Sequence, residues 1–237
     1  MKNLLEEFEQ ALDEGIHDPN IFKAIFMAGP PGAGKNRVIT DLGLSATGLK
    51  LLDIDKTLLY LAKNRPPVNP DYDRGRTVTM KQIPQFQKGM LGLLINTTGR
   101  NYEPLMALNK ELKQAGYDTF MLFVDVNYDV AFQRIQDRAK HATNPADKRK
   151  VDLDYFETAY DDAKENAEFY ALMFGNQFSY ITNNVEDEQV VEAAGDEMSA
   201  EYQQSLITAS KKVNRFLKKP LSPTAQEIIA KVSSSSA

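Results

Sequence analysis

IFKAIFMAGPPGAGKN, residues 21–36, is the stretch of sequence that decides the fold. Residues 21–28 form a short, almost wholly apolar run, which predicts a buried strand. The glycine-rich residues 29–35 predict a loop, and residues 36–42 predict a helix that begins inside this loop. A strand, a tight loop and a helix are therefore expected in direct succession.

The loop sequence GPPGAGKN matches seven of the eight positions of the pattern G-x-x-x-x-G-K followed by serine or threonine. Glycines let successive backbone N–H groups turn toward phosphate oxygens, and the helix N-terminus and Lys35 add positive potential. A plain glycine turn with an exposed lysine is the weaker alternative, because the flanking strand and helix are also predicted. We expect the following residues to bind a nucleotide: Gly29, Pro30, Pro31, Gly32, Ala33, Gly34, Lys35, Asn36 and Arg37.

Asn36 occupies the one position that departs from the pattern. The usual hydroxyl at this position is a magnesium ligand, and an amide oxygen is a longer and differently angled substitute. Three interpretations stay open: the amide or a bridging water holds the metal, carboxylates elsewhere hold it, or the site binds nucleotide without catalysis.

The rest of the chain alternates between apolar runs and helical patterns, which predicts a parallel sheet of about five strands with helices on both faces. Further strands are expected at residues 49–54, 91–96, 119–126 and 178–182. Helices are expected at residues 57–63, 83–89, 102–115, 128–139 and 153–174. Residues 65–79 contain three prolines and show neither period, so they predict a loop that closes over a substrate.

Composition and charge exclude several classes of protein. The chain has 237 residues, of which 42% are apolar, so it can bury a full core. Its net charge of −5 gives no general attraction to nucleic acid or anionic membranes. It has no cysteine, and no apolar stretch approaches the ~20 residues of a membrane span. These features predict a cytoplasmic protein without disulfides or thiolate zinc sites.

Changes in charge divide the sequence into three expected parts. Residues 1–20 predict an N-terminal helix, residues 21–184 the main domain, and residues 185–237 an acidic linker followed by a basic helical tail. Residues 186–201 hold seven acidic residues and no basic one. The basic residues of the tail are candidates for contact with DNA phosphates: Lys211, Lys212, Arg215, Lys218 and Lys219.

Two carboxylates follow the second predicted strand, at the edge where ligands bind to an open parallel sheet. If the strand continues through Asp53 and Asp55, both side chains point the same way. Asp53 and Asp55, together with Asn36, are therefore candidate magnesium ligands, and Asp55 is also the candidate base that accepts a proton from an acceptor hydroxyl. The alternative role is capping of the next helix, for which Thr57 is a second candidate.

Arginines are candidates for stabilising charge on the transferred phosphoryl group. A glycine turn after the third strand directs Arg100 toward the cleft, although a surface ion pair with Glu103 is the alternative. Asn96 stands where many nucleotide-binding proteins with this glycine loop carry an acidic magnesium ligand on a central strand. Arg134 and Arg138 lie one helical turn apart, before a basic insertion with Lys148, Arg149 and Lys150 that predicts a lid. A solvated charged face is the alternative interpretation of these lysines.

Four segments together resemble the zeta-toxin-like P-loop kinases: Gly29 to Lys35, Leu52 to Asp55, Ile95 to Arg100, and Arg134 to Arg138. The resemblance extends over roughly residues 21–184. It is closer to kinase-like proteins of large tailed bacteriophages, through the sequence TGRNY at residues 98–102 and the helix that follows. Such an origin would place the protein in the host cytoplasm.

The resemblance implies a P-loop NTPase three-layer fold of the nucleoside-kinase type, with ATP and Mg²⁺ as cofactors. It also implies an acidic base after the second strand and lid arginines. The candidate catalytic residues are therefore Lys35, Asp55, Arg100, Arg134 and Arg138. The acceptor stays open, because zeta toxins are similar to enzymes that phosphorylate UDP-N-acetylglucosamine, whereas related phage kinases are expected to act on nucleotides or on hydroxymethylated pyrimidines in DNA. The alternatives are a kinase for DNA, including 5′-hydroxyl ends, and a nucleotide-binding module without catalysis.

Overall fold

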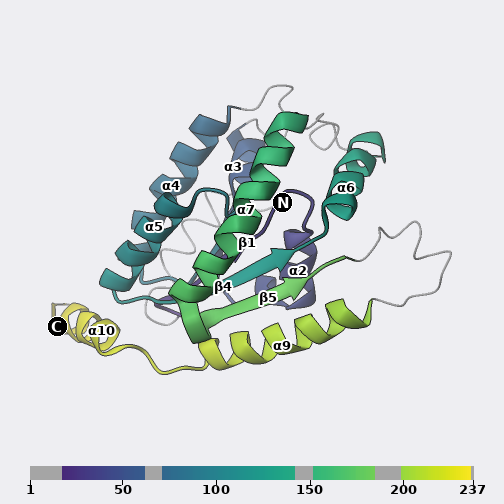
Figure 1. Ribbon diagram of the computed structural model, residues 1–237. Helices are drawn as coiled ribbons and strands as arrows, with labels where there is room; N and C mark the ends of the chain where they lie inside the picture. Colours follow the sequence, from purple (N-terminus) through teal and green to yellow (C-terminus); the bar gives the residue numbers. More distant parts are fainter. Residues whose placement is uncertain (1–17, 62–70, 142–151, 185–198, 236–237) are drawn as a thin grey trace.

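A parallel sheet of five strands forms the centre of the computed structural model, which describes residues 18–61, 71–141, 152–184 and 199–235. The strand order is β2-β3-β1-β4-β5, and Figure 1 shows β5 next to β4 at one edge of the sheet. The strands are β1 (Lys23–Ala28), β2 (Lys50–Leu52), β3 (Leu93–Asn96), β4 (Asp118–Asp125) and β5 (Phe178–Thr182). All neighbouring strands run parallel, and every residue of β1 and nearly all of β4 is buried, as expected for a sheet covered on both faces.

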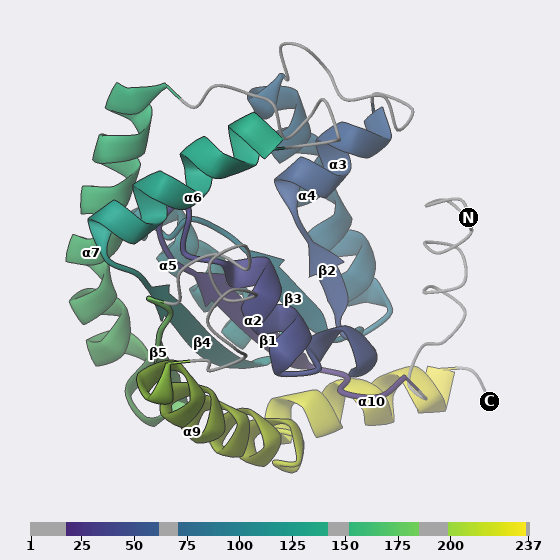
Figure 2. The same cartoon turned by 90° about the vertical axis from the view of Figure 1, so that its right-hand side faces the viewer.

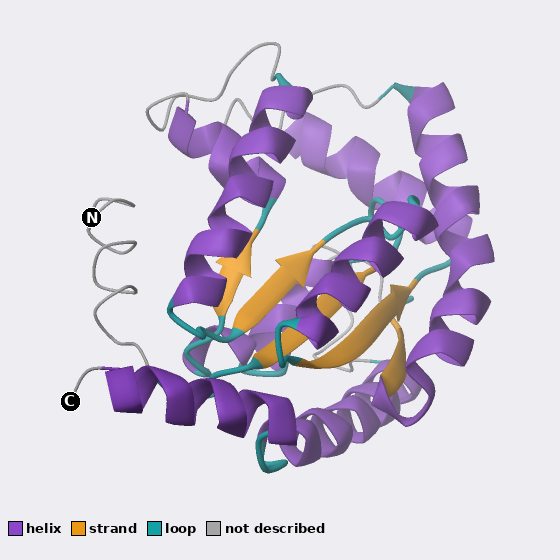
Figure 3. Ribbon diagram, turned by 90° about the vertical axis from the view of Figure 1, so that its left-hand side faces the viewer, coloured by secondary structure: helices purple, strands orange, loops and turns teal. Residues whose placement is uncertain are grey.

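Helices cover both faces of the sheet (Figure 3). The α-helices are α2 (Lys35–Asp41), α3 (Ile54–Leu61), α4 (Tyr72–Lys88), α5 (Tyr102–Gln114), α6 (Tyr128–His141), α7 (Leu153–Phe174), α9 (Ala200–Leu217) and α10 (Pro223–Ser235). Short 3₁₀ helices occur at Leu44–Ala46 and Gly175–Gln177.

Alternate residues of the strands feed two separate apolar cores. Ile25 and Met27 of β1 face a core built with α2, α6 and α9, whereas Ala24 and Phe26 face a core built with α4, α5 and the second half of α7. This alternation follows from the period of two along a strand. The predicted three-layer α/β fold is therefore confirmed, with its five parallel strands and a helical C-terminal region.

The predicted loop at residues 65–79 is wrong for its second half, because α4 begins at Tyr72. The Asp71 carboxylate caps the helix by accepting a hydrogen bond of 2.9 Å from the N–H of Arg74. Gly75 and Thr79 form much of the buried face of α4, and a Cβ at Gly75 would lie 2.7 Å from the Leu58 side chain. A buried face made of small and polar residues shows no apolar period. The remainder of that prediction lies outside the described residues.

The C-terminal helices pack against the main sheet. Tyr202, Val213 and Phe216 of α9 belong to the same core as α2, while Ala225 of α10 belongs to the opposite core. The predicted boundary at residue 184 is thus crossed by extensive apolar contacts, and the division into three parts stays a prediction. The predicted N-terminal helix falls mostly on residues 1–17, outside the described part.

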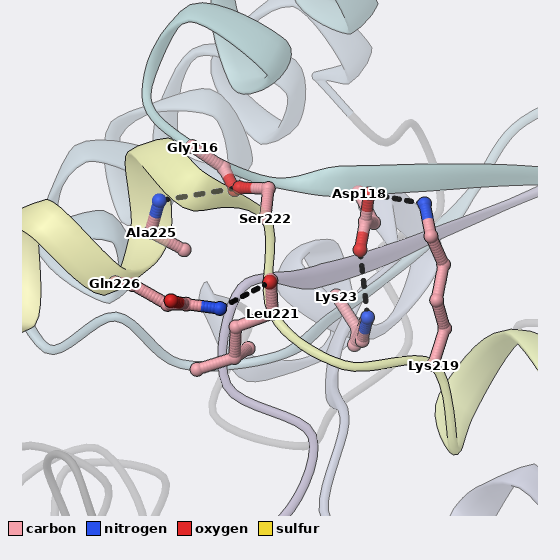
Figure 4. Close-up of polar contacts among 8 residues, drawn as sticks. All are labelled: Lys23, Gly116, Asp118, Lys219, Leu221, Ser222, Ala225 and Gln226. Atoms are coloured by element: carbon pink, nitrogen blue, oxygen red, sulfur yellow. Dashed lines mark hydrogen bonds and ion pairs between the residues drawn. The ribbon is translucent and has the colours of Figure 1, made fainter.

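An ion cluster ties the C-terminal segment to the start of the sheet (Figure 4). The Asp118 carboxylate lies 2.7 Å from the ammonium of Lys23, which is 2% exposed, and 3.1 Å from that of Lys219. Next to it, the hydroxyl of Ser222 donates a hydrogen bond of 3.0 Å to the Gly116 carbonyl. Burial by itself raises the pKa of Asp118, but the hydrogen bonds from both lysines outweigh it and hold the pKa below its usual range.

Asp118→Asn is expected to lower the free energy of unfolding at pH 7 by about 3 kcal/mol, because the buried Lys23 loses its counter-charge. Since the folded-state pKa is lowered, the contribution of Asp118 is present above the ordinary pKa of 3.8 and is lost as the pH falls through the folded-state value. The difference between variant and wild type should therefore shrink below about pH 4. Urea unfolding across pH checks this, with the exposed Asp129→Asn as control. An unchanged difference at every pH would contradict it.

No helix in the part of the chain that the structure describes is both long and apolar enough to cross a membrane.

Candidate active site

The carboxyl ends of the strands bring the predicted site residues to one edge of the sheet. In the register of the sheet, Met27 pairs with Asn96, Leu52 with Ile95, and Asp125 with Thr182. The loop after β1, the Asp53 side chain after β2 and the residues after β5 therefore lie along the same edge. In Figure 2, α2 lies in front of β1, and α3 and α6 lie on the side toward which the strands point.

Glycines allow the loop at residues 29–36 to approach its neighbours closely. Gly32 and Gly34 adopt φ angles of 80° and 76°, in the left-handed region that favours glycine. A Cβ at Gly29 would lie 2.2 Å from the Val124 carbonyl oxygen, and one at Gly32 would lie 2.5 Å from that of Ala131. The loop is thus fixed against β4 and α6, and the helix α2 begins at Lys35 as the motif requires.

Lys35 folds back over the loop. Its ammonium group donates hydrogen bonds of 2.7 Å to the Gly29 carbonyl and 3.2 Å to the Pro30 carbonyl. Burial lowers its pKa from 10.5 to about 8, the charges of Asp53 and Asp55 act to raise it, and that of Arg138 lowers it further. An anion placed against this ammonium would favour its charged form, because the opposite charge offsets the cost of burying the ammonium.

Asn183, which directly follows β5, holds the loop and is a site residue that the sequence analysis does not identify. It is completely buried, its amide donates a 2.8 Å hydrogen bond to the Ala33 carbonyl, and its amide oxygen accepts one of 3.3 Å from Arg134. Arg134 also donates to the Gly32 carbonyl at 3.0 Å. The one available signal was the position of Asn183 directly after the last predicted strand, at the ligand edge.

Asn183→Ala is expected to lower the free energy of unfolding by about 1–3 kcal/mol, since the Ala33 carbonyl loses its donor in a buried place. Nucleotide affinity should fall as well, because the loop loses its support. Urea unfolding and an ATP titration measure the two effects. The control is Asn184→Ala, whose side chain accepts a hydrogen bond of 2.7 Å from the N–H of Asn127 at a more exposed position. Equal effects of the two substitutions would contradict this role for Asn183.

Asp53 lies just beyond β2, which ends at Leu52 instead of continuing to residue 54 as predicted. Its Oδ1 accepts a hydrogen bond of 3.1 Å from the N–H of Lys56 in the first turn of α3, so the capping alternative is confirmed for this residue. Its Oδ2 accepts one of 2.6 Å from the amide of Asn96, which also lies 3.4 Å from the Asn36 amide oxygen. Asp53, Asn96 and Asn36 are thereby linked.

Asp55 lies in the first turn of α3 and is exposed. Because the strand has ended, it does not share a strand face with Asp53, which was the expectation. Its charge is nevertheless close enough to raise the pKa of Lys35, as that of Asp53 is. Asp53 caps α3 and Asp55 lies in its first turn, so the start of this helix keeps both carboxylates near the loop.

Arg100 follows a tight glycine turn, as predicted, with Gly99 at a φ of 73°. The turn is held by α7, where Tyr170 donates a hydrogen bond of 2.8 Å to the Gly99 carbonyl. Arg100 itself lies 3.5 Å from Asp162 and over the ring of Tyr155 at 5.1 Å. The expected alternative partner was Glu103, and the ion pair is instead formed with α7.

Arg138 is exposed on α6, one turn beyond Arg134. The two arginines therefore differ: Arg134 supports the loop, while Arg138 acts on Lys35 through its charge. The predicted lid lysines and arginine at residues 148–150 lie outside the described residues.

The side chains predicted to hold magnesium do not form a preformed cation site. Both oxygens of Asp53 and the amide oxygen of Asn36 accept hydrogen bonds from N–H donors. Within the described residues, no group of three or more His, Cys, Asp or Glu side chains is arranged to hold a metal ion. Magnesium ligation by Asn36, Asp53 and Asp55 stays a prediction.

A glycine loop between β1 and α2, in a parallel sheet with β3 and β4 on either side of β1, defines the class of P-loop kinases. The chain belongs to the zeta toxin family, whose family model matches residues 73–194. The matched segment begins after the loop at residues 29–36, so the loop geometry is separate evidence for the class. No curated protein matches the sequence.

Solved structures with a similar fold include the following two. A chain from the PezAT chromosomal toxin–antitoxin system of Streptococcus pneumoniae has 18% sequence identity and a TM-score of 0.51, with 90% of this chain and 97% of that chain covered. The structure of AvrRxo1-ORF1:-ORF2 with ATP has 9% identity and a TM-score of 0.57, with 90% and 83% covered. At sequence identities this low, the similarity shows a shared fold alone.

Proposed function

We propose that the protein is an ATP-dependent kinase that transfers the γ-phosphoryl group to a hydroxyl of a small molecule or nucleotide. The observation that carries the proposal is the loop at residues 29–36, with Lys35 folded over it and Asp53 and Asp55 close enough to act on its charge. Family membership supports it, and the ATP named in the AvrRxo1 structure agrees with it.

In the proposed reaction, the loop N–H groups and Lys35 hold the β and γ phosphates, and Lys35 moves from the loop carbonyls to the phosphate oxygens. The acceptor oxygen bonds to the γ-phosphorus as the bond from that phosphorus to the β–γ bridging oxygen breaks. Asp55 takes the hydroxyl proton, because it is exposed near the loop. Arg138 supplies positive charge to the transferred group, whereas Arg134 keeps the loop in shape.

Arg100 is the remaining arginine that is predicted to act on phosphate. Its ion pair with Asp162 and its contact with the ring of Tyr155 hold its guanidinium against α7. It serves as a phosphate or acceptor ligand only if it leaves Asp162, and this step stays a prediction.

The structure does not favour DNA as the acceptor. Lys212 donates a hydrogen bond of 2.9 Å to the Phe178 carbonyl, and Lys219 pairs with Asp118, so two members of the basic group in the tail contact the protein itself. Contact of this group with DNA and a relation to phage proteins therefore stay predictions.

The proposed function is tested by incubating the protein with ATP labelled at the γ-phosphate, a magnesium salt and a panel of sugars, nucleotides and hydroxymethylated DNA. Transfer of label to a hydroxyl-bearing small molecule or nucleotide is the expected result, and transfer to DNA alone would favour the DNA kinase. Saturable ATP binding without transfer to any acceptor would favour the non-catalytic module.

A further inference from the structure

One side-chain amide lies between the two oxygen-bearing groups that the sequence predicts to bind magnesium. The Nδ2 atom of Asn96 is 2.6 Å from Asp53 Oδ2 and 3.4 Å from Asn36 Oδ1. The N–H₂ group therefore faces both oxygens with its positive end, in the way that a bridging cation would.

This arrangement opposes the binding of a cation by Asp53. Magnesium requires direct contact with oxygen lone pairs at about 2.0–2.1 Å, and the amide donor of Asn96 occupies this side of the carboxylate. The other carboxylate oxygen accepts the N–H of Lys56 at 3.1 Å, which fixes the carboxylate against α3. A cation must displace a hydrogen bond to a charged group before it binds here.

The opposite end of the Asn96 amide supports the same conclusion. Its Oδ1 atom is buried and has no hydrogen-bond partner among the described residues. Leaving a buried acceptor without a hydrogen bond costs free energy. The amide therefore keeps this orientation only because the hydrogen bond from its Nδ2 to Asp53 contributes more than that cost. Turning the amide end for end would place two oxygens together, which is favourable only with a cation between them.

We infer that Asn96 prevents the nucleotide-free protein from binding a divalent cation, so that the cation enters only together with the phosphates of a nucleotide. The inference rests on the proposed nucleotide site. Asn96 is thus a residue that determines the order of binding, and an acidic residue at this position would create a cation site that needs no nucleotide.

The test is a titration of the nucleotide-free protein with Mn²⁺, followed by electron paramagnetic resonance of the free ion. Asn96→Asp is expected to bind Mn²⁺ at least about tenfold more tightly than the wild type, a difference of about 1.4 kcal/mol. Asn176→Asp, an exposed substitution near the start of β5 that adds the same charge, should behave as the wild type. Thermal unfolding establishes that each variant is folded.

Asn96→Ala removes the donor without adding charge, and its Mn²⁺ affinity is expected to lie between those of the wild type and Asn96→Asp. Wild-type protein that binds Mn²⁺ as tightly as Asn96→Asp would overturn the inference, and so would an Asn96→Ala variant that binds no better than wild type. A separate titration of the protein with ATP and a magnesium salt tests the proposed nucleotide site itself. Failure there would remove the proposed function, whereas the Mn²⁺ result bears on Asn96 alone.

Discussion

Lys35→Met is expected to lower the rate of phosphoryl transfer by about a hundredfold to a thousandfold, in line with the loss of one preorganised charge donor at a transition state. Methionine keeps an unbranched apolar stem but has no ammonium group to follow the phosphate oxygens. Steady-state turnover of labelled ATP with the acceptor found in the panel measures the effect, and the exposed Lys110→Met serves as control.

The same substitution should not destabilise the fold. Burial lowers the pKa of Lys35 to about 8, so the charged ammonium costs free energy in the folded protein at neutral pH. Because the folded-state pKa lies below 10.5, this cost diminishes as the pH rises from about 8 to 10.5. Lys35→Met is therefore expected to unfold at or above the wild-type temperature at pH 7. Full activity in a folded Lys35→Met variant would refute the role of the ammonium group.

Asp55→Asn is expected to reduce transfer by about a hundredfold to ten-thousandfold, which is the range for loss of a general base. Nucleotide affinity should be kept or increased, because a negative charge near the phosphates is removed. This separation of binding from chemistry distinguishes a base from a residue that holds the loop.

The matched control for Asp55→Asn is Asp73→Asn, an exposed carboxylate in the first turn of the neighbouring helix α4. Turnover and an ATP titration on both variants give the comparison. A fall in ATP affinity as large as the fall in turnover would contradict the assignment of Asp55 as base.

Local patterns made the centre of the fold predictable. The strand, glycine loop and helix at residues 21–42 are neighbours in sequence, and their apolar run, glycines and helix start each act over a few residues. Asp53 and Asp55 were identified for the same reason, since they directly follow a predicted strand. The end of that strand was missed because Asp53 favours capping α3 over extending β2.

Contacts between distant segments were not predictable in this way. Asn183 reaches the Ala33 carbonyl across 150 positions of sequence, and Lys23 meets Asp118 across 95. Arg134 is a residue type that can bind an anion, but its guanidinium donates a hydrogen bond to the Gly32 carbonyl. The start of α4 was not predictable because its close packing depends on Gly75, where there is no room for a side chain. A glycine contributes nothing to an apolar pattern.

Binding of ATP by the loop at residues 29–36 is the claim on which the rest depends, and isothermal titration of wild type and Lys35→Met with ATP tests it most directly. The predicted result is that the wild type binds ATP saturably and that the variant binds it at least about tenfold more weakly. A tenfold weakening corresponds to a loss of about 1.4 kcal/mol of binding free energy. Heat of binding that is absent in both proteins, or the same in both, would contradict the account.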